Sequence, residues 1–225
     1  PSISITAGPQ TVCVGGSATL TATTGGGTGT CTIQWQSSTN NVNFTDIPGE
    51  NATTFNPSTA AAGTTFYRAT YSCTGNGCNA ATSNSSSVTV VADPTISITQ
   101  GPQTVCVGGS ATLTATTGGG TGTCTIQWQS STDNVNFTNI PGENATTFNP
   151  STAAAGTTFY RATYSCTGNG CNAATSNSSS VTVVADPTIS ITQGPQTVCV
   201  GGSATLTATT GGGTGTCTIQ WQSST

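Results

Sequence analysis

The sequence predicts an all-β protein made of tandem antiparallel β-sandwich repeats, each 93 residues long. Two observations support this fold class. The segment QTVCVGGSATLTATTGGGTGTCTIQWQSST occurs three times, with its first cysteine at Cys13, Cys106 and Cys199. Within each copy, short stretches rich in Thr, Val, Tyr and Phe alternate with Gly, Pro and Asn turns. About seven such strands in a unit of this size are typical of a sandwich.

The strands of the first repeat follow from apolar alternation and from the turn residues between them. Gly8-Pro9 splits the first strand in two, and Gly15-Gly16 turns the chain into the next one. Pro48-Gly49 separates two short strands, and residues 74–77 form a tight turn before the last strand. The expected strands cover residues 2–6 with 11–14, 17–24, 32–37, 43–47, 53–56, 64–73 and 78–91.

The core is expected from side chains that fall on one face of these strands, because successive side chains of a strand point to opposite faces. Ala18, Leu20 and Ala22 share one face of their strand, and Ile33 and Trp35 share a face of the next. The expected core residues are Leu20, Ile33, Trp35, Phe55, Tyr67 and Val90, together with the counterparts Trp128, Tyr160 and Trp221.

The repeats predict three segments: domain 1–93, domain 94–186 and an incomplete third repeat at 187–225 that holds only the first strands. The first two differ at four positions: Ser2/Thr95, Ala7/Gln100, Asn40/Asp133 and Asp46/Asn139. We expect the chain to be part of a longer array. The alternative is that residues 187–225 take their missing strands from another molecule.

Three short patterns lie where an immunoglobulin domain has its core motifs: Leu20-Thr21-Ala22, Trp35 and Tyr67-Arg68-Ala69. Alanine occupies both positions of the usual core cysteines. With QWQSST, IPG, FYRAT and CNAATSN, the whole unit resembles the Ig-like repeats of giant secreted bacterial surface proteins, including gliding adhesins. The resemblance implies an immunoglobulin-like sandwich and an extracellular or cell-surface location, but no particular ligand.

Composition excludes most catalytic and nucleic-acid functions. The chain has no His and only two basic residues, both arginines, and charged residues make up 4% of it. A histidine triad and a lysine Schiff base are therefore impossible, and phosphate backbones would meet no basic surface. No run of about 18 apolar residues is present. We expect no enzyme activity, catalytic residue, cofactor, nucleic-acid partner or membrane insertion in this segment.

Four cysteines per repeat indicate disulfides, and disulfides indicate an oxidising, extracellular setting. A zinc site would normally need two close cysteine pairs, and only Cys73 and Cys78 form one, so no metal is expected. Cys73 and Cys78 can pair across their turn, or Cys31 can pair with either. The candidates are Cys13, Cys31, Cys73, Cys78, Cys106, Cys124, Cys166, Cys171, Cys199 and Cys217.

Cys13 is expected at the opposite end of its repeat from the other cysteines. A strand of ten residues spans roughly 30 Å, and a disulfide needs Cα atoms within about 7 Å. Cys13 can therefore bond Cys124, Cys166 or Cys171 of the following repeat, which would stiffen the array. The alternative places both bridges within one repeat.

Other candidate sites are weak. Asp46 becomes Asn139 in the second repeat, so no carboxylate pair that contains it is shared. Asp93 is the single acid of the junction at 91–94, which is too few for a calcium linker. The glycine loop at 25–29 lacks the lysine of a phosphate loop but could press on a neighbouring domain. Glycosylation sequons stand at Asn43, Asn51, Asn84, Asn136, Asn144 and Asn177.

The expected function is a non-enzymatic extracellular structural protein that forms a stiff fibre, stalk or sheath. Near-identical units make identical contacts at each step, which favours self-association into a homopolymer or filament. The alternative is an adhesin module, or a spacer for a tip that binds a glycan or host protein. In that case Tyr71 or Phe44 would stack on the sugar.

Overall fold

The computed structural model describes residues 1–225 and contains twenty strands and no helix. None of its elements is a helix of the length and hydropathy that a membrane crossing requires. The chain divides into two compact units: Pro1–Ile96 with Thr117–Thr125 and Tyr164–Thr175, and Ser97–Thr116 with Ile126–Thr163 and Ser176–Thr225. The first unit thus contains the first repeat together with residues 94–96, 117–125 and 164–175 of the second.

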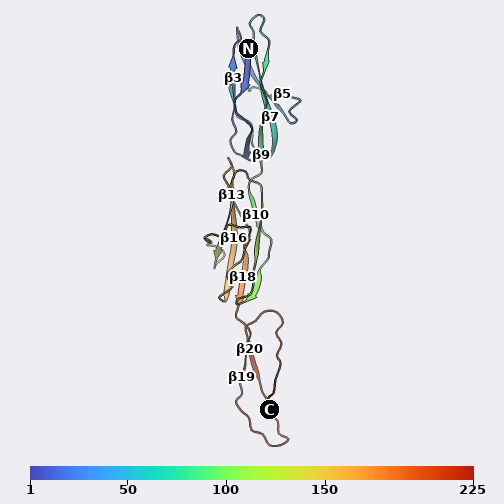
Figure 1. Cartoon of the computed structure of the whole chain (residues 1–225), viewed down its shortest axis with the longest axis vertical. Coiled ribbons are helices and arrows are strands. Elements are labelled where there is room, and N and C mark those ends of the chain that lie inside the picture. Colours follow the sequence, from blue (N-terminus) through green and yellow to red (C-terminus); the bar gives the residue numbers. More distant parts are fainter. The chain divides into compact units, whose positions relative to one another are not determined.

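Two sheets form the first repeat, and their strands run roughly along one direction (Figure 1). The smaller sheet has the order β1-β3-β6 and the larger one the order β2-β9-β7-β4-β5, with β8 beside β7. Their bounds are β1 Ser2–Ile5, β2 Gln10–Cys13, β3 Leu20–Gly25, β4 Cys31–Ser38, β5 Thr45–Asp46, β6 Thr54–Phe55, β7 Gly63–Cys73, β8 Ala81–Thr82 and β9 Ser86–Val91.

The split first strand explains how the two sheets are joined. β1 pairs antiparallel with β3 in one sheet, whereas β2 pairs parallel with β9 in the other. Pro9 lies between them and has no N–H to give to a ladder, so the chain leaves the first sheet there. The remaining pairs with a known register are antiparallel. This is an immunoglobulin-like sandwich, as predicted.

The second repeat has the same strand orders, with β10-β12-β15 in one sheet and β11-β18-β16-β13-β14 in the other. Its strands are β10 Thr95–Ile98, β11 Gln103–Cys106, β12 Leu113–Gly118, β13 Cys124–Ser131, β14 Thr138–Asn139, β15 Thr147–Phe148, β16 Gly156–Cys166, β17 Ala174–Thr175 and β18 Ser179–Val184. Residues 187–225 form only the hairpin of β19 (Thr188–Ile191) and β20 (Ala208–Gly211).

The core of the first repeat is a cluster of aromatic and aliphatic side chains between the sheets. Trp35 is completely buried, and its indole N–H donates to the Ala52 carbonyl at 2.9 Å. The Phe55 ring lies 5.3 Å from the rings of both Trp35 and Tyr67. The other residues expected in the core of the two complete repeats are also buried: Leu20, Ile33, Val90, Trp128 and Tyr160.

The expected core role of Trp221 is wrong. Its side chain is 46% exposed, although its counterpart Trp35 is completely buried. The reason is that Trp35 is covered from β6 and β7 by residues such as Phe55 and Tyr67, and residues 187–225 contain no counterparts of these strands. Burial of this tryptophan therefore depends on distant strands, not on its local sequence.

The expected last strand at 78–91 is interrupted, because side chains replace the ladder in its middle. The Ala69 amide donates to Ser83 Oγ at 2.9 Å. Asn84 Oδ1 accepts from the Ile5 amide at 3.0 Å, and Asn84 Nδ2 donates back to the Ile5 carbonyl at 3.3 Å. The segment therefore divides into β8 and β9. Asn84 lies between these two strands in the sequence and binds β1.

Candidate functional site

Each complete repeat contains a disulfide within its larger sheet. Cys31 pairs with Cys73, and Cys124 with Cys166, each with a Cα–Cα distance of 4.0 Å. Cys31 and Cys73 lie directly opposite in the β4–β7 ladder. The next pair, Thr30 and Thr74, is hydrogen-bonded at 3.0 Å. Hydrogen-bonded pairs alternate with non-hydrogen-bonded ones, where Cα atoms come closest, so the cysteines occupy a position suited to bridging.

The cysteines on either side of the hairpin turn do not pair. The β7–β8 register sets Thr70 opposite Thr82 and Tyr71 opposite Ala81. Continuing that register would place Asn79, not Cys78, opposite Cys73. The turn is one residue out of step for a Cys73–Cys78 bridge, and Cys31 takes Cys73 instead.

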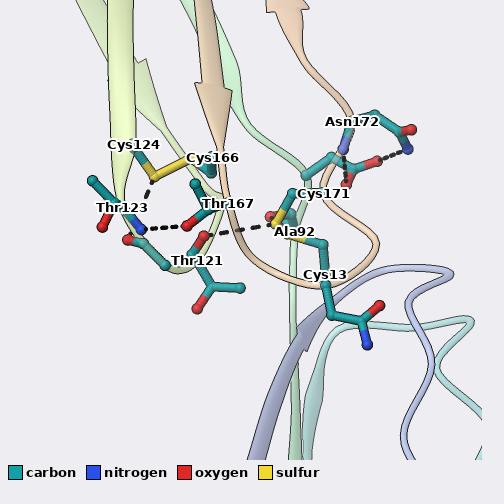
Figure 2. Close-up of a disulfide and its surroundings, with 12 residues drawn as sticks. Cys13, Ala92, Thr121, Thr123, Cys124, Cys166, Thr167, Cys171 and Asn172 are labelled. Atoms are coloured by element: carbon teal, nitrogen blue, oxygen red, sulfur yellow. Dashed lines mark hydrogen bonds between the residues drawn. A yellow bond between two sulfur atoms is a disulfide. The ribbon is translucent and has the colours of Figure 1, made fainter.

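A third disulfide links the repeats: Cys13 bonds Cys171 across a sequence separation of 158, with a Cα–Cα distance of 4.9 Å (Figure 2). Cys13 is the last residue of β2, and Cys171 lies in the loop after β16. Both residues belong to the first compact unit. Of the three partners considered for Cys13, Cys171 is the one that it bonds in the structure. We call this bridge and the hydrogen bonds around it the staple.

Asn169 holds the two sides of the staple together, a contact that the sequence did not suggest. Its carbonyl accepts from the Cys13 amide at 2.8 Å. Its side-chain Oδ1 accepts from the Ser17 amide at 3.2 Å, and its Nδ2 donates to the Ser17 carbonyl at 2.8 Å. One asparagine therefore forms three hydrogen bonds with the last residue of β2 and the turn that follows it. The only available signal was the repeated TGNGC turn sequence, with an asparagine between two glycines.

Glycines allow the two backbones to come this close. A Cβ on Gly16 would lie 2.5 Å from the Asn169 carbonyl oxygen, and a Cβ on Gly170 would collide with the Gly16 backbone. Gly170 also has a φ of +79°, which side-chain-bearing residues rarely adopt. The turn after β2 and the loop after β16 fit only without side chains at these positions.

The linker between the repeats is also fastened. Asp93 accepts two hydrogen bonds from Asn172, one from its backbone at 3.3 Å and one from its side chain at 3.0 Å. The Gly120 amide donates to the Ala92 carbonyl at 2.8 Å. The glycine loop of the second repeat therefore contacts the linker that follows the first repeat. Cys13 itself is completely buried, so the arrangement forms a covalent, hydrogen-bonded joint.

Comparison with protein families identifies what the repeats are. Residues 3–92 and 95–185 each match the family described as "Domain of unknown function (DUF8696)". The chain belongs to this family. The two DUF8696 domains cover most of the sequence, and the staple connects one DUF8696 domain to the next. No match was found among curated proteins.

Solved structures similar to the two DUF8696 domains include three N-terminal domains of the highly immunogenic outer capsid protein (Hoc) of bacteriophage RB49. The identity is 16% and the TM-score 0.45, covering 85% of this chain and 61% of that one. The N-terminal four Ig domains of Dscam1 isoform 7.44 match at 13% identity and a TM-score of 0.39, covering 80% of this chain and 45% of that one. The chain thus spans less than two thirds of either structure.

Four of the ten candidate disulfide cysteines of this DUF8696 chain are free thiols: Cys78, Cys106, Cys199 and Cys217. The expectation of a bridge is therefore wrong for them in this structure. Cys217 is the counterpart of Cys31, whose partner Cys73 has no counterpart in residues 187–225. Cys78 and Cys106 are the counterparts of Cys171 and Cys13, so their partners would have to come from a further repeat.

Several predicted surface sites are already engaged. The Arg68 guanidinium lies 4.1 Å from the Phe44 ring centroid and its Nε donates to Gln36 at 2.7 Å. Arg68 therefore covers one face of Phe44, while Tyr71 packs against the core. Among the sequons, Asn84 and Asn177 use their amide nitrogens to bind the Ile5 and Ile98 carbonyls.

The remaining sequons differ between the two domains. Asn43 and Asn51 are exposed. Asn136 Nδ2 donates to Asp133 at 2.7 Å, and Asn144 can donate to the Ile126 carbonyl at 3.0 Å. A sugar attached to an amide nitrogen would disturb the hydrogen bonds of this second pair. Asn43 and Asn51 therefore remain the better candidates for glycosylation.

Replacing Gly170 with alanine is expected to open the staple. The added Cβ would meet Gly16, and overpacking of this kind costs about 1–3 kcal/mol, roughly a tenfold to hundredfold loss of the bridged form in a redox buffer. Gly77→Ala is the matched control, since Gly77 has nearly the same φ, +77°, and its Cβ would meet nothing. Quantitative non-reducing peptide mapping measures the fraction of Cys13–Cys171 bridge in each variant. Equal fractions in the two variants would contradict the expectation.

Asp133 is expected to give the second DUF8696 domain a pH dependence that Asn40 does not give the first. Hydrogen bonds from the backbone of Asn136 and Val135 and from the Asn136 side chain lower the pKa of Asp133 below its usual range. A lowered pKa in the folded state stabilises above the unfolded pKa of about 4, and this stabilisation is lost as the pH falls toward the folded value. Asn40 occupies the same position in the first domain.

Asp133→Asn is therefore expected to remove part of the acid destabilisation of the second domain, and Asn40→Asp to introduce it in the first. Urea midpoints measured from pH 7 down to pH 2 check both. If wild type and Asp133→Asn lose stability in parallel below pH 4, the hydrogen bonds do not favour the carboxylate.

Proposed function

We propose that the chain is a non-enzymatic, extracellular structural protein whose stapled immunoglobulin-like repeats form a stiff fibre, stalk or sheath. The observation that carries this proposal is the Cys13–Cys171 bridge with its Asn169 contacts. Structural disulfides form and persist in oxidising compartments and are rare in the cytosol, which supports a location outside the cytoplasm. A joint with one covalent bond and several hydrogen bonds also restricts bending at the linker, where Pro94 already fixes its own φ.

The staple also changes how tension passes through the chain. When the ends are pulled, the chain can be drawn out from its start to Cys13 and from Cys171 to its end. The residues between them form a closed covalent loop. They include strands β3 to β16, hence most of both complete repeats. Tension therefore passes through the disulfide, and the unfolded length of these repeats stays locked.

Single-molecule force spectroscopy tests the proposal. Under oxidising conditions the fully extended chain is expected to lack the 158 residues enclosed by the bridge, a length on the order of 500 Å at about 3.3–3.6 Å per residue. Adding a reductant is expected to release it. Cys171→Ser is expected to release a little under half of this length without a reductant, because the two bridges within the repeats still close 42 residues each.

An oxidised wild-type chain that extends as far as the reduced chain would overturn the mechanical role. Cys78→Ser serves as the control, because Cys78 occupies the same loop position in the first repeat and is free. It is expected to extend like the wild type. A sugar-binding role has less support, since Arg68 covers one face of Phe44 and Tyr71 is packed on the core.

A further inference from the structure

We propose that Arg161 of the second repeat binds a carboxylate group of an acidic polysaccharide, a polymer of uronic acids. Arg68 and Arg161 are the only two basic side chains in the sequence. Arg161 points away from the core, because Tyr160 and Ala162 beside it on β16 are buried and successive side chains of a strand point to opposite faces. The inference goes beyond the proposed structural role and does not depend on it.

The Arg161 side chain is held in place by two contacts. Its Cζ atom lies 4.1 Å from the centroid of the Phe137 ring, and its Nε donates to Gln129 Oε1 at 2.7 Å. These contacts use one face and one nitrogen of the guanidinium, and neither terminal nitrogen donates a hydrogen bond to the protein. A guanidinium can bind both oxygens of a carboxylate through parallel hydrogen bonds. Because it is already held in place, it loses little conformational entropy when a ligand binds.

The first repeat has the same arrangement, but with a carboxylate of its own. Gln36 Oε1 accepts from Arg68 Nε at 2.7 Å, and Gln36 Nε2 donates to Asp46 Oδ1, also at 2.7 Å. One amide group therefore separates the guanidinium from the carboxylate, and this separation lies within the Debye length of about 8 Å at physiological salt. A ligand carboxylate that approaches Arg68 would be repelled by Asp46.

The second repeat lacks this carboxylate. Gln129 Nε2 donates to Asn139 Oδ1 at 2.8 Å, so the same chain of hydrogen bonds ends on a neutral side chain. The acid that the second repeat has instead is Asp133, which accepts hydrogen bonds within its own turn, from Ser131, Val135 and Asn136. A ligand carboxylate at Arg161 would therefore meet an amide where one at Arg68 would meet a negative charge.

The surroundings of Arg161 favour a polysaccharide over an acidic peptide. Strand β16 lies inside its sheet, between β18 and β13, so it has no free edge to which a peptide backbone could add. Thr163 and Ser165 follow Arg161 at alternate positions of β16 and share its face. The Ser165 hydroxyl lies 3.3 Å from that of Thr125 on β13. These neighbours are uncharged, and their hydroxyls both donate and accept hydrogen bonds, as a sugar hydroxyl does.

Phe137 acts differently here from an aromatic ring on which a sugar stacks. Its ring faces the Arg161 guanidinium and thereby positions the charged group. The contact with the sugar is made by the guanidinium and by the hydroxyls along β16. Sugar binding of this kind requires an acidic sugar, because a neutral one would leave the terminal nitrogens of Arg161 without a carboxylate.

The experiment measures binding of the full chain to three surfaces, which carry polygalacturonate, poly-glutamate or dextran. The wild type is expected to bind polygalacturonate more tightly than the other two. Arg161→Gln and Asn139→Asp are each expected to weaken this binding about tenfold, the effect of losing one charge-assisted hydrogen-bonded contact. Asn139→Asp is compatible with the fold, because the first repeat has Asp46 at the same position.

The first repeat provides the matched controls. Arg68→Gln is expected to leave binding unchanged, whereas Asp46→Asn is expected to create a second site and to raise the amount bound about twofold. The inference is overturned if Asn139→Asp or Arg161→Gln binds like the wild type, if Arg68→Gln weakens binding as much as Arg161→Gln, or if the wild type binds poly-glutamate or dextran equally well or binds nothing. Peptide mapping of the Cys13–Cys171 bridge in the same samples keeps the two proposals apart, because the bridge can be intact in a chain that binds no polysaccharide.

Discussion

Replacing Trp35 with alanine is expected to destabilise the first repeat by about 3–5 kcal/mol, the usual cost of removing a large buried aromatic side chain. Trp35 is completely buried, contacts Phe55, and donates its indole N–H to the Ala52 carbonyl. The truncation therefore leaves a cavity and an unpaired carbonyl together. Because a domain's whole stability is about 5–15 kcal/mol, much of the first repeat's margin would be lost.

The chain contains its own control. Trp221 lies in an identical local sequence but is 46% exposed, so Trp221→Ala is expected to change stability by about 0.5 kcal/mol or less. Trp128→Ala is expected to act on the second repeat as Trp35→Ala does on the first. Hydrogen exchange with mass spectrometry can follow the repeats separately, because peptides containing Asn40 and Asp133 differ in mass. A loss of protection with Trp221→Ala equal to that with Trp35→Ala would contradict the assigned burial.

The alternation within a strand was enough to predict the buried faces of the complete repeats. Leu20 and Ala22 are buried along β3, and Ile33 and Trp35 along β4, because neighbouring strands cover each face. The same local pattern misplaced Trp221, since burial there requires strands that residues 187–225 do not contain. Sequence alternation thus reports which side of a strand would be covered, whereas only the tertiary structure shows whether anything covers it.

The staple was predictable only in outline. Strand length separated Cys13 from the other cysteines of its repeat and left three partners in the next. Choosing Cys171 depends on how the Gly16 and Gly170 backbones meet and on the three hydrogen bonds of Asn169. None of these contacts produces a periodic pattern. The register at the hairpin, in which Asn79 rather than Cys78 would face Cys73, likewise cannot be predicted until the β7–β8 pairing is known.

Replacing Cys171 with serine is expected to reduce stability by about 2–4 kcal/mol, the typical contribution of a native disulfide. The bridge encloses 158 residues, and a longer closed loop restricts the unfolded chain more. Cys78→Ser is the matched control: it changes the same residue in the same loop of the first repeat, where no bridge exists. That variant is expected to be as stable as the wild type.

The comparison of the two serine variants is made by urea unfolding with and without a reductant. Without reductant, the two repeats of Cys171→Ser should also unfold in separate transitions. In the wild type the bridge joins the repeats, so the freedom that one repeat gains on unfolding depends on whether the other is still folded. With reductant the wild type loses all three bridges, and the difference between the variants should vanish. If Cys171→Ser and Cys78→Ser unfold alike under oxidising conditions, the bridge adds no stability and the joint depends on its hydrogen bonds alone.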